Sequence, residues 1–153
     1  MSNRTQILVG GYFNMSGPSL HKLTAHRSIH NGALTEARDL LEVLEQVYHD
    51  NQIEHTTIAA RTLVEHWETR TVAHADSEEE GFYQKKLEEN PQLEELLIML
   101  KRDHQLFRTL IKDIKQILDD YGVNDDVIDR FKAIYVLVQI HNHDEETYLL
   151  EEL

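Results

Sequence analysis

The sequence predicts an all-α fold, specifically an up-down-up-down antiparallel four-helix bundle with a short N-terminal arm. Four long segments carry apolar residues at alternating steps of three and four, which is the spacing of one helix face. Helix stop and start signals separate these segments, and none of them alternates with the period of two that strands show. Four helices of roughly 30 residues joined by short loops favour antiparallel neighbours.

The first helix is predicted to begin at Pro18, because proline suits the first helical turn. Residues 1–17 show no helical period, so we interpret them as the arm and residues 18–153 as the bundle. The helical pattern breaks at residues 49–52, which places the first turn there. The inward face of this helix is predicted to carry Leu23, His26, His30, Ala33, Ala37, Leu40, Leu44 and Val47.

The second helix is predicted from about residue 54 to residue 87, and Asn90-Pro91 marks the start of the third. Gly122 then stops the third helix and Asn124 starts the fourth. The predicted inward positions of the second helix are Ala60, Val64, Trp67, Thr71, His74, Glu78 and Gly81. Those of the third are Leu93, Leu97, Leu100, His104, Phe107, Ile111, Ile114 and Leu118, and those of the fourth are Val127, Phe131, Ile134, Val138, His141, Glu145 and Tyr148.

The composition excludes several classes of function. The chain has no cysteine, which rules out disulfides, iron–sulfur clusters, thiolate zinc sites and cysteine nucleophiles. Its formal net charge of −13 argues against nucleic acid or an anionic membrane as a partner. No apolar run approaches the roughly 20 residues of a membrane span, and no signal peptide is evident, so we expect a cytoplasmic location.

Two segments repeat one motif, His74-x-x-x-Glu78 and His141-x-x-x-Glu145. Residues four apart lie on the same face of a helix, so each motif presents an imidazole and a carboxylate side by side. On an exposed face such a pair usually only stabilises the helix, but here both pairs lie on the predicted apolar face. Burying the two carboxylates unpaired would cost several kcal/mol, and a pair of metal ions would offset that cost. Their neighbours Glu79, Glu80 and Glu146 are predicted to face solvent.

In each predicted hairpin, a lone histidine on one helix lies at the same distance from the turn as the histidine of the His-x-x-x-Glu pair on the other helix. His30 and His74 are equidistant from the first predicted turn, and His104 and His141 are equidistant from the Gly122–Asn124 turn. A lone histidine in an apolar stripe is more often a hydrogen-bonded core residue than a ligand. Here, however, both hairpins place a lone histidine level with a His-x-x-x-Glu pair, and this repetition favours a ligand role. Ferritin-type centres instead use Glu-x-x-His pairs, and none of the ten histidines has an acid three residues ahead of it.

These residues, in this order, resemble the hemerythrin-like family of HHE cation-binding domains over residues 19–152. The resemblance implies a centre of two non-haem iron ions, bridged by an oxo or hydroxo group when oxidised, with manganese and zinc as less favoured metals. His30 and His74 would serve one iron and His104 and His141 the other, with the pairing left open. Glu78 and Glu145 would bridge both ions.

The sequence departs from the oxygen-carrying members of the family on the third helix. Those proteins carry His-x-x-x-His there, whereas Leu100 and Arg108 stand four residues either side of His104. His26 is one turn from His30 on the same face and is a possible additional or alternative ligand. We favour His30, because the apolar residues that follow it match those after His104.

The resemblance predicts a protein that binds dioxygen, or a related small ligand such as nitric oxide or peroxide, for sensing, storage or iron and redox handling. One alternative is a di-iron oxidase or peroxidase acting on an unidentified substrate, with Tyr83 or Tyr148 near a ligand turn. The other alternative is a metal-free helical module that binds partners through its acidic surface. The pattern makes no prediction about the oligomeric state.

Overall fold

The structure is a computed structural model that describes residues 23–150, and this part of the chain is helical with no strand. The prediction of an all-α helical bundle is confirmed for this range, whereas the predicted arm, residues 1–17, lies outside it. The first and third helices are α2 (Leu23–His49) and α6 (Glu94–Tyr121). The second helical path consists of α3 (Ile53–Trp67), η3 (Glu68–Val72), α4 (Ala73–Ser77), η4 (Glu78–Phe82) and α5 (Tyr83–Glu89), and the fourth of α7 (Asp125–Asp144) and η6 (Glu145–Leu149).

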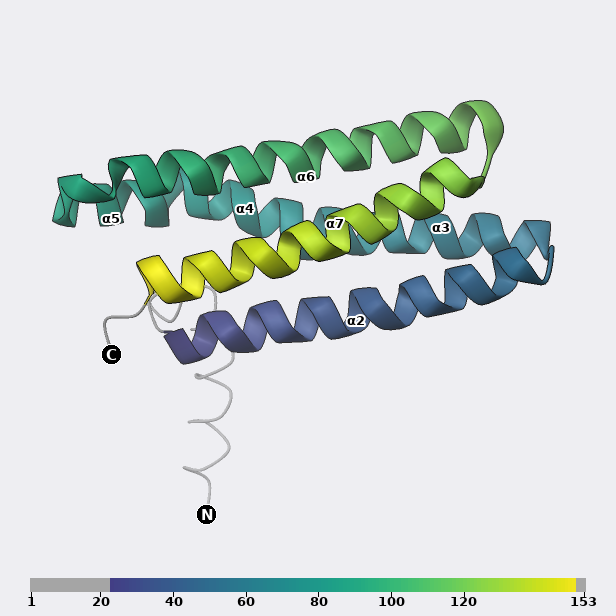
Figure 1. Cartoon of the computed structure of the whole chain (residues 1–153), viewed down its shortest axis with the longest axis horizontal. Helices are drawn as coiled ribbons and strands as arrows, with labels where there is room; N and C mark the ends of the chain where they lie inside the picture. The colour runs from purple at the N-terminus through teal and green to yellow at the C-terminus, as the bar shows by residue number, and fades with distance from the viewer. Residues whose placement is uncertain (1–22, 151–153) are drawn as a thin grey trace, which may run out of the picture.

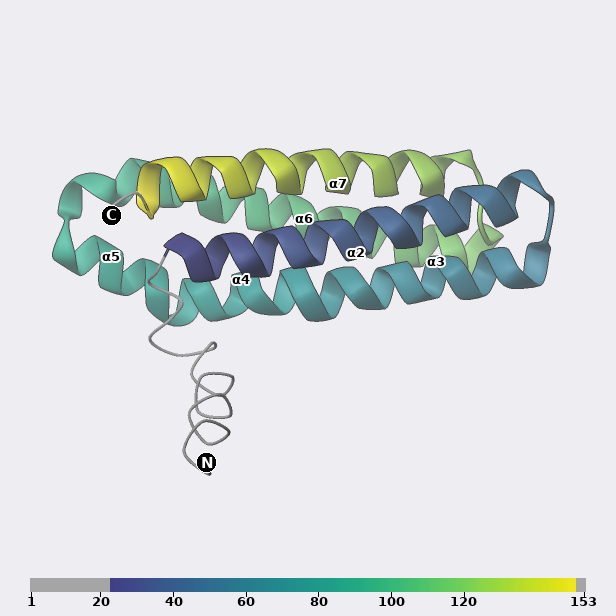
Figure 2. The same ribbon diagram turned by 90° about the horizontal axis from the view of Figure 1, so that it is seen from below.

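The helices lie along one long axis, as Figure 1 and Figure 2 show. α2 packs against α3, and α6 packs against α7, with the turns of both pairs at the same end of the molecule. The connection from α5 to α6, through the short 3₁₀ helix η5 (Pro91–Leu93), lies at the opposite end. α2 also contacts α7, and α3 contacts α6, so the two pairs enclose a common interior. No helix among residues 23–150 is long and apolar enough to cross a membrane.

The residues that end and begin the helices act as the sequence predicts. The Asn90 side chain accepts a hydrogen bond from the Gln92 N–H, and the Asn124 side chain accepts one from the Val127 N–H at 3.1 Å. Gly122 has a φ of 76°, the left-handed conformation that ends a helix most easily when no Cβ is present. These caps satisfy backbone groups that a helix end leaves without partners.

Two of the three π-helical turns within residues 23–150 begin at the glutamates of the repeated motif. The carbonyl of Glu78 accepts a hydrogen bond from the Tyr83 N–H, and the carbonyl of Glu145 accepts one from the Leu150 N–H at 3.1 Å. A bond across five residues holds one more residue in the turn than an α-helix does. Side chains beyond each glutamate are therefore rotated by about 100° around the helix axis relative to a regular α-helix.

This rotation corrects two of the predicted inward positions. Gly81 is exposed and the Tyr148 side chain is 58% exposed, so the prediction that they face the interior is wrong. The positions that are buried instead are Phe82, Tyr83, Leu149 and Leu150. The π turns thus replace a glycine and a tyrosine by bulkier or apolar side chains at the interior of this end of the bundle.

The apolar core is divided in two along the bundle axis. One buried cluster surrounds Phe107, Ile111 and Phe131, toward the α2–α3 and α6–α7 turns. A smaller one contains Leu97, Leu100 and, from each of the two motif π turns, the last residue of the turn and the residue after it. Between the two clusters lies a layer of buried polar side chains: His26, His30, Glu78, His104, His141 and Glu145. This layer is the site described next.

Candidate metal centre

Two glutamates from separate helices form the middle of the buried polar layer. Glu78 comes from the second helical path and Glu145 from the fourth, and their relative exposures are 1% and 0%. Each is the first residue of a π turn and the last residue of a His-x-x-x-Glu motif. Two carboxylates buried against each other need protons or cations to balance their charge.

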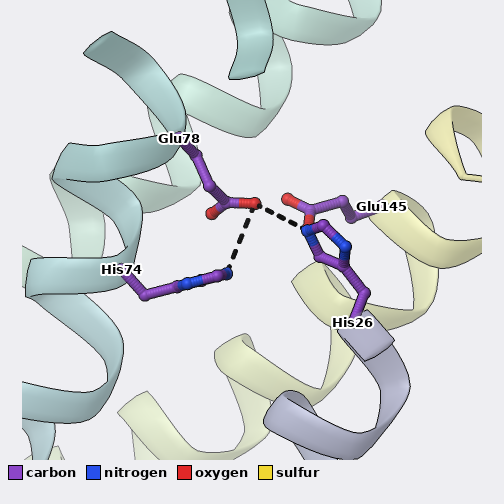
Figure 3. A group of neighbouring side chains, drawn as sticks. All are labelled: His26, His74, Glu78 and Glu145. Carbon is purple, nitrogen blue, oxygen red and sulfur yellow. Dashed lines mark ion pairs between the residues drawn. The ribbon is translucent and has the colours of Figure 1, made fainter. Parts of the chain in front are cut away.

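The first group of donors around this pair consists of His26, His74, Glu78 and Glu145, as Figure 3 shows. The Nε2 atom of His74 lies 3.6 Å from Glu78 Oε2. The Nε2 atom of His26 lies 3.7 Å from the same oxygen and 3.6 Å from Glu145 Oε1. Four donor atoms from three helical paths therefore face a common point, and the second path supplies two of them, His74 and Glu78.

The second group consists of Glu78, His104, His141 and Glu145, and all four residues are buried. The Nε2 atom of His104 lies 3.5 Å from Glu78 Oε1 and 3.2 Å from the Nε2 atom of His141. The Nε2 atom of His141 lies 3.4 Å from Glu145 Oε2. Each glutamate thus offers one oxygen to the first group and its other oxygen to the second.

His30 joins the site as well. Its Nε2 atom lies 3.6 Å from Glu145 Oε1, the same oxygen that His26 approaches. The sequence leaves open whether His26 or His30 is the first-helix ligand, and the structure brings both imidazoles to the carboxylate pair. The site therefore gathers five histidines, although the third helix supplies only one of them.

The donor set fits metal ions. Nitrogen and oxygen donors about 2.1 Å from one ion lie roughly 3 to 3.5 Å from one another, close to the 3.2 to 3.7 Å found within the two groups. Three buried donor atoms, His74 Nε2, Glu78 Oε2 and Glu145 Oε1, make no hydrogen bond in the described part of the chain. Atoms of this kind are costly to bury unless a cation or a proton reaches them. The cluster is therefore compatible with metal binding.

A second row of carboxylates holds the histidines in the orientation that metal binding needs. The Nδ1–H of His104 donates to Glu79 at 2.9 Å, and that of His141 donates to Asp103 at 2.9 Å. The Nδ1–H of His30 donates to Glu146 at 3.1 Å. A proton on Nδ1 leaves the lone pair of Nε2 directed at the carboxylate pair.

The prediction that Glu79 and Glu146 face solvent is therefore wrong, whereas Glu80 is exposed as predicted. The Glu79 side chain is 25% exposed and the Glu146 side chain is 14% exposed. Each of the two binds an arginine on its outer side as well as a histidine. Arg108 donates to Glu79 at 2.6 Å and Arg27 donates to Glu146 at 2.9 Å. The contacts come from neighbouring helices, α6 for Glu79 and α2 for Glu146, which helical spacing within one segment does not predict.

Removing one of these outer carboxylates should weaken metal binding without abolishing it. In Asp103→Ala the His141 ring loses its acceptor, and we expect the metal affinity to fall about 10- to 100-fold, with the stoichiometry at saturation unchanged. Competition titration against a chelator measures both quantities. Asp113→Ala, which removes an exposed aspartate from the same helix, is the matched control. Equal affinities of the two variants would contradict this role for Asp103.

In the metal-free protein the two glutamates have opposite pKa shifts. Burial and the charge of Glu145 raise the pKa of Glu78 well above its usual value. Burial also raises the pKa of Glu145, but hydrogen bonds from His141 and Glu78 outweigh it and hold that pKa well below its usual value. A single proton shared by the pair accounts for both directions.

The histidines also divide into two kinds. Burial lowers the pKa of His74 to about 4, and burial together with the charge of His141 lowers the pKa of His104 to about 4. The pKa of His141 rises to about 9 despite its burial, because Asp103 and Glu145 accept its hydrogen bonds. Neutral imidazoles at His74 and His104 are ready to bind a metal, whereas His141 must release a proton.

A small cavity opens onto Glu78 and onto four of the five histidines, His30, His74, His104 and His141. Its volume is about 20 Å³, which is close to the space that one water molecule needs. Beside it runs an open groove of about 460 Å³ that shares Ile29, Ala33, Arg70 and His74 with the cavity wall. The His74 side chain is 18% exposed, the largest fraction among the five histidines. A small molecule can therefore approach the site from the groove on the side of His74.

Sequence reasoning missed the roles of several of these residues. Asp103 is adjacent to His104 in the sequence, and no helical spacing relates it to His141. The sequence therefore did not predict that Asp103 would accept a hydrogen bond from His141. Tyr83, named only for its place near a ligand turn, is buried and donates to Glu145 Oε2 at 2.5 Å. Burial and the charges of Glu78 and Glu145 raise its pKa, which keeps the phenol neutral without a metal. The π turn after Glu78 is the feature that a regular helical pattern could not reveal.

The comparison with protein families agrees with this geometry. The model of the hemerythrin HHE cation-binding domain matches residues 22–153, a range that contains every histidine and carboxylate of the site. We found no match to the chain among curated proteins or among solved structures. Because the family match covers far more than half of the chain, the protein belongs to the hemerythrin family of HHE cation-binding domains.

Proposed function

We propose that the protein is a non-haem di-iron protein of the cytoplasm that binds dioxygen, or a related small ligand such as nitric oxide or peroxide. The observation that carries the proposal is the pair of donor groups that share Glu78 and Glu145. Two ions bridged by the same carboxylates would lie roughly 3.5–4 Å apart, near enough to act on one small ligand. Sensing, storage and iron or redox handling are the roles that such binding would serve.

In this proposal His26, His30 and His74 would hold one iron and His104 and His141 would hold the other. Glu78 and Glu145 would contribute to both. A set of imidazoles and carboxylates without sulfur suits iron, and manganese and zinc are the weaker alternatives. The bound irons would supply the electrons that reduce dioxygen. The outer carboxylates Glu79, Asp103 and Glu146 hold the rings in place. The apolar neighbours Phe107 and Val138 line the cavity, which has room for about one water molecule.

The size of the cavity supports a ligand of very few atoms. A volume of about 20 Å³ admits one water-sized molecule. The net charge of −13 further disfavours nucleic acid as a partner. A metal-free interaction module is disfavoured by the two buried carboxylates, because without a cation they would be retained at a cost in stability.

The test is metal analysis of anaerobically reconstituted protein, followed by absorbance spectra as oxygen is admitted. We expect two irons per chain and a visible charge-transfer band that appears with oxygen. Loss of this band on removing oxygen supports reversible binding. Less than one iron per chain after reconstitution would overturn the di-iron proposal, and no spectral change with oxygen, nitric oxide or peroxide would overturn small-ligand binding.

A di-iron oxidase or peroxidase is the second candidate. The groove beside His74 favours an enzyme of this kind, because its volume of about 460 Å³ is far larger than a diatomic ligand needs. The same spectra separate the two functions. A band that decays without recovery, together with the consumption of oxygen or peroxide over many turnovers, identifies the enzyme. A stable band that reverses identifies the binding protein.

A further inference from the structure

The two halves of the metal centre have unequal numbers of histidines. On α2, His26 lies one turn ahead of His30, and both reach Glu145. On α6 the position one turn ahead of His104 is Leu100, which belongs to the apolar cluster. His30 adds a third imidazole beside the two of the first group, whereas the second group has only two, so an ion held by the second group would have one protein donor fewer.

Tyr83 supplies a polar atom where the second group lacks one. Its side chain is buried, with 1% relative exposure, in the same cluster as Leu100. The phenol oxygen lies 3.4 Å from His104 Nε2 and donates to Glu145 Oε2 at 2.5 Å. Both neighbours are donor atoms of the second group, so the phenol oxygen lies among the donors and not behind them.

The backbone and the ring packing both hold Tyr83 in this place. Its N–H closes the π turn on the carbonyl of Glu78, just as the N–H of Leu150 closes the other π turn on Glu145. Its ring stacks on His104 with centroids 5.5 Å apart and an angle of 11° between the planes. The equivalent position in the other half is Leu150, which is equally buried. An apolar residue thus suffices for packing at that position.

We propose that the phenol oxygen of Tyr83 is the third protein donor to the metal ion held by His104 and His141. The inference rests on the proposed metal centre and adds a ligand to it. When the metal binds, the O–H bond breaks, the oxygen binds the ion with its electron pair, and the proton passes to the buffer. The 3.2 to 3.5 Å separations among the Tyr83, His104, His141 and Glu78 donor atoms suit a shared ion.

The test compares ferric protein carrying Tyr83→Phe with the natural chain. Phenylalanine keeps the ring that stacks on His104 and removes only the oxygen. For the natural chain we expect a visible phenolate-to-iron charge-transfer band, with the ring vibrations of a phenolate enhanced in the resonance Raman spectrum. Both should disappear in Tyr83→Phe. Tyr148→Phe, whose tyrosine is 58% exposed on η6, is the control and should keep both.

Iron content, measured on the same samples, separates the two proposals. A natural chain with two irons but no phenolate vibrations overturns the Tyr83 ligand and leaves the di-iron proposal standing. Phenolate vibrations that persist in Tyr83→Phe also overturn it. A chain that binds no iron overturns both proposals.

A rescue variant tests the argument from asymmetry. Tyr83→Phe should lower the iron affinity of the second position at least about tenfold. Adding Leu100→His places an imidazole one turn ahead of His104, where α2 has His26. The double variant should recover affinity without recovering the phenolate vibrations. An affinity unchanged by Tyr83→Phe would contradict a ligand role, whatever the double variant does.

Discussion

Glu78→Ala is expected to abolish both metal positions, so that iron content falls from two ions per chain to less than one. Glu78 lies in both donor groups, with one oxygen 3.6 Å from His74 and the other 3.5 Å from His104. Losing it removes a donor from each ion and the bridge between them. Metal analysis after anaerobic reconstitution measures the loss, and Glu145→Ala should behave in the same way.

Two further variants make this prediction specific. His74→Ala removes a residue that belongs to one group only, so we expect it to weaken one position and spare the other. His143→Ala changes an exposed histidine on α7 and should leave two irons per chain. Iron content in Glu78→Ala equal to that of His143→Ala would show that Glu78 holds no metal.

Removing the metal is expected to lower the melting temperature on the order of 10 °C. Ions that bind only the folded chain stabilise it by about 4 kcal/mol at a thousandfold excess over the dissociation constant. For a chain of this length each kcal/mol corresponds to roughly 2–4 °C. Without metal, the folded state also keeps two buried glutamates, and burial together with the charge of Glu145 raises the pKa of Glu78. Thermal unfolding of the iron-loaded and chelated forms, followed by circular dichroism, measures the difference.

The double variant Glu78→Gln/Glu145→Gln is the matched control for this experiment. Glutamine preserves the shape of each side chain and removes the charge, so the chelated variant should be at least as stable as the chelated natural chain. Added iron should no longer raise its melting temperature. A natural chain whose melting temperature is the same with and without iron would contradict the metal's role in the fold.

The sequence determined the helices and most of the histidines that gather at the site. The apolar stripes, together with Asn90, Gly122 and Asn124, predicted where helices begin and end, because caps and helical spacing are local properties. The two motifs and the distances from each turn predicted that His74, Glu78, His104, His141 and Glu145 would meet. They do meet, and their role as ligands stays a prediction until metal analysis is done.

Only the tertiary structure decided what lies around that centre. His26 and His30 are on one face of α2, and spacing alone could not tell which of them reaches Glu145, whereas packing against η6 brings both to it. The π turns after Glu78 and Glu145 move the following residues around the helix axis. This places Tyr83 at the donors and turns Tyr148 outward. A regular helical period cannot reveal an extra residue in one turn, because the period assumes the same number of residues in every turn.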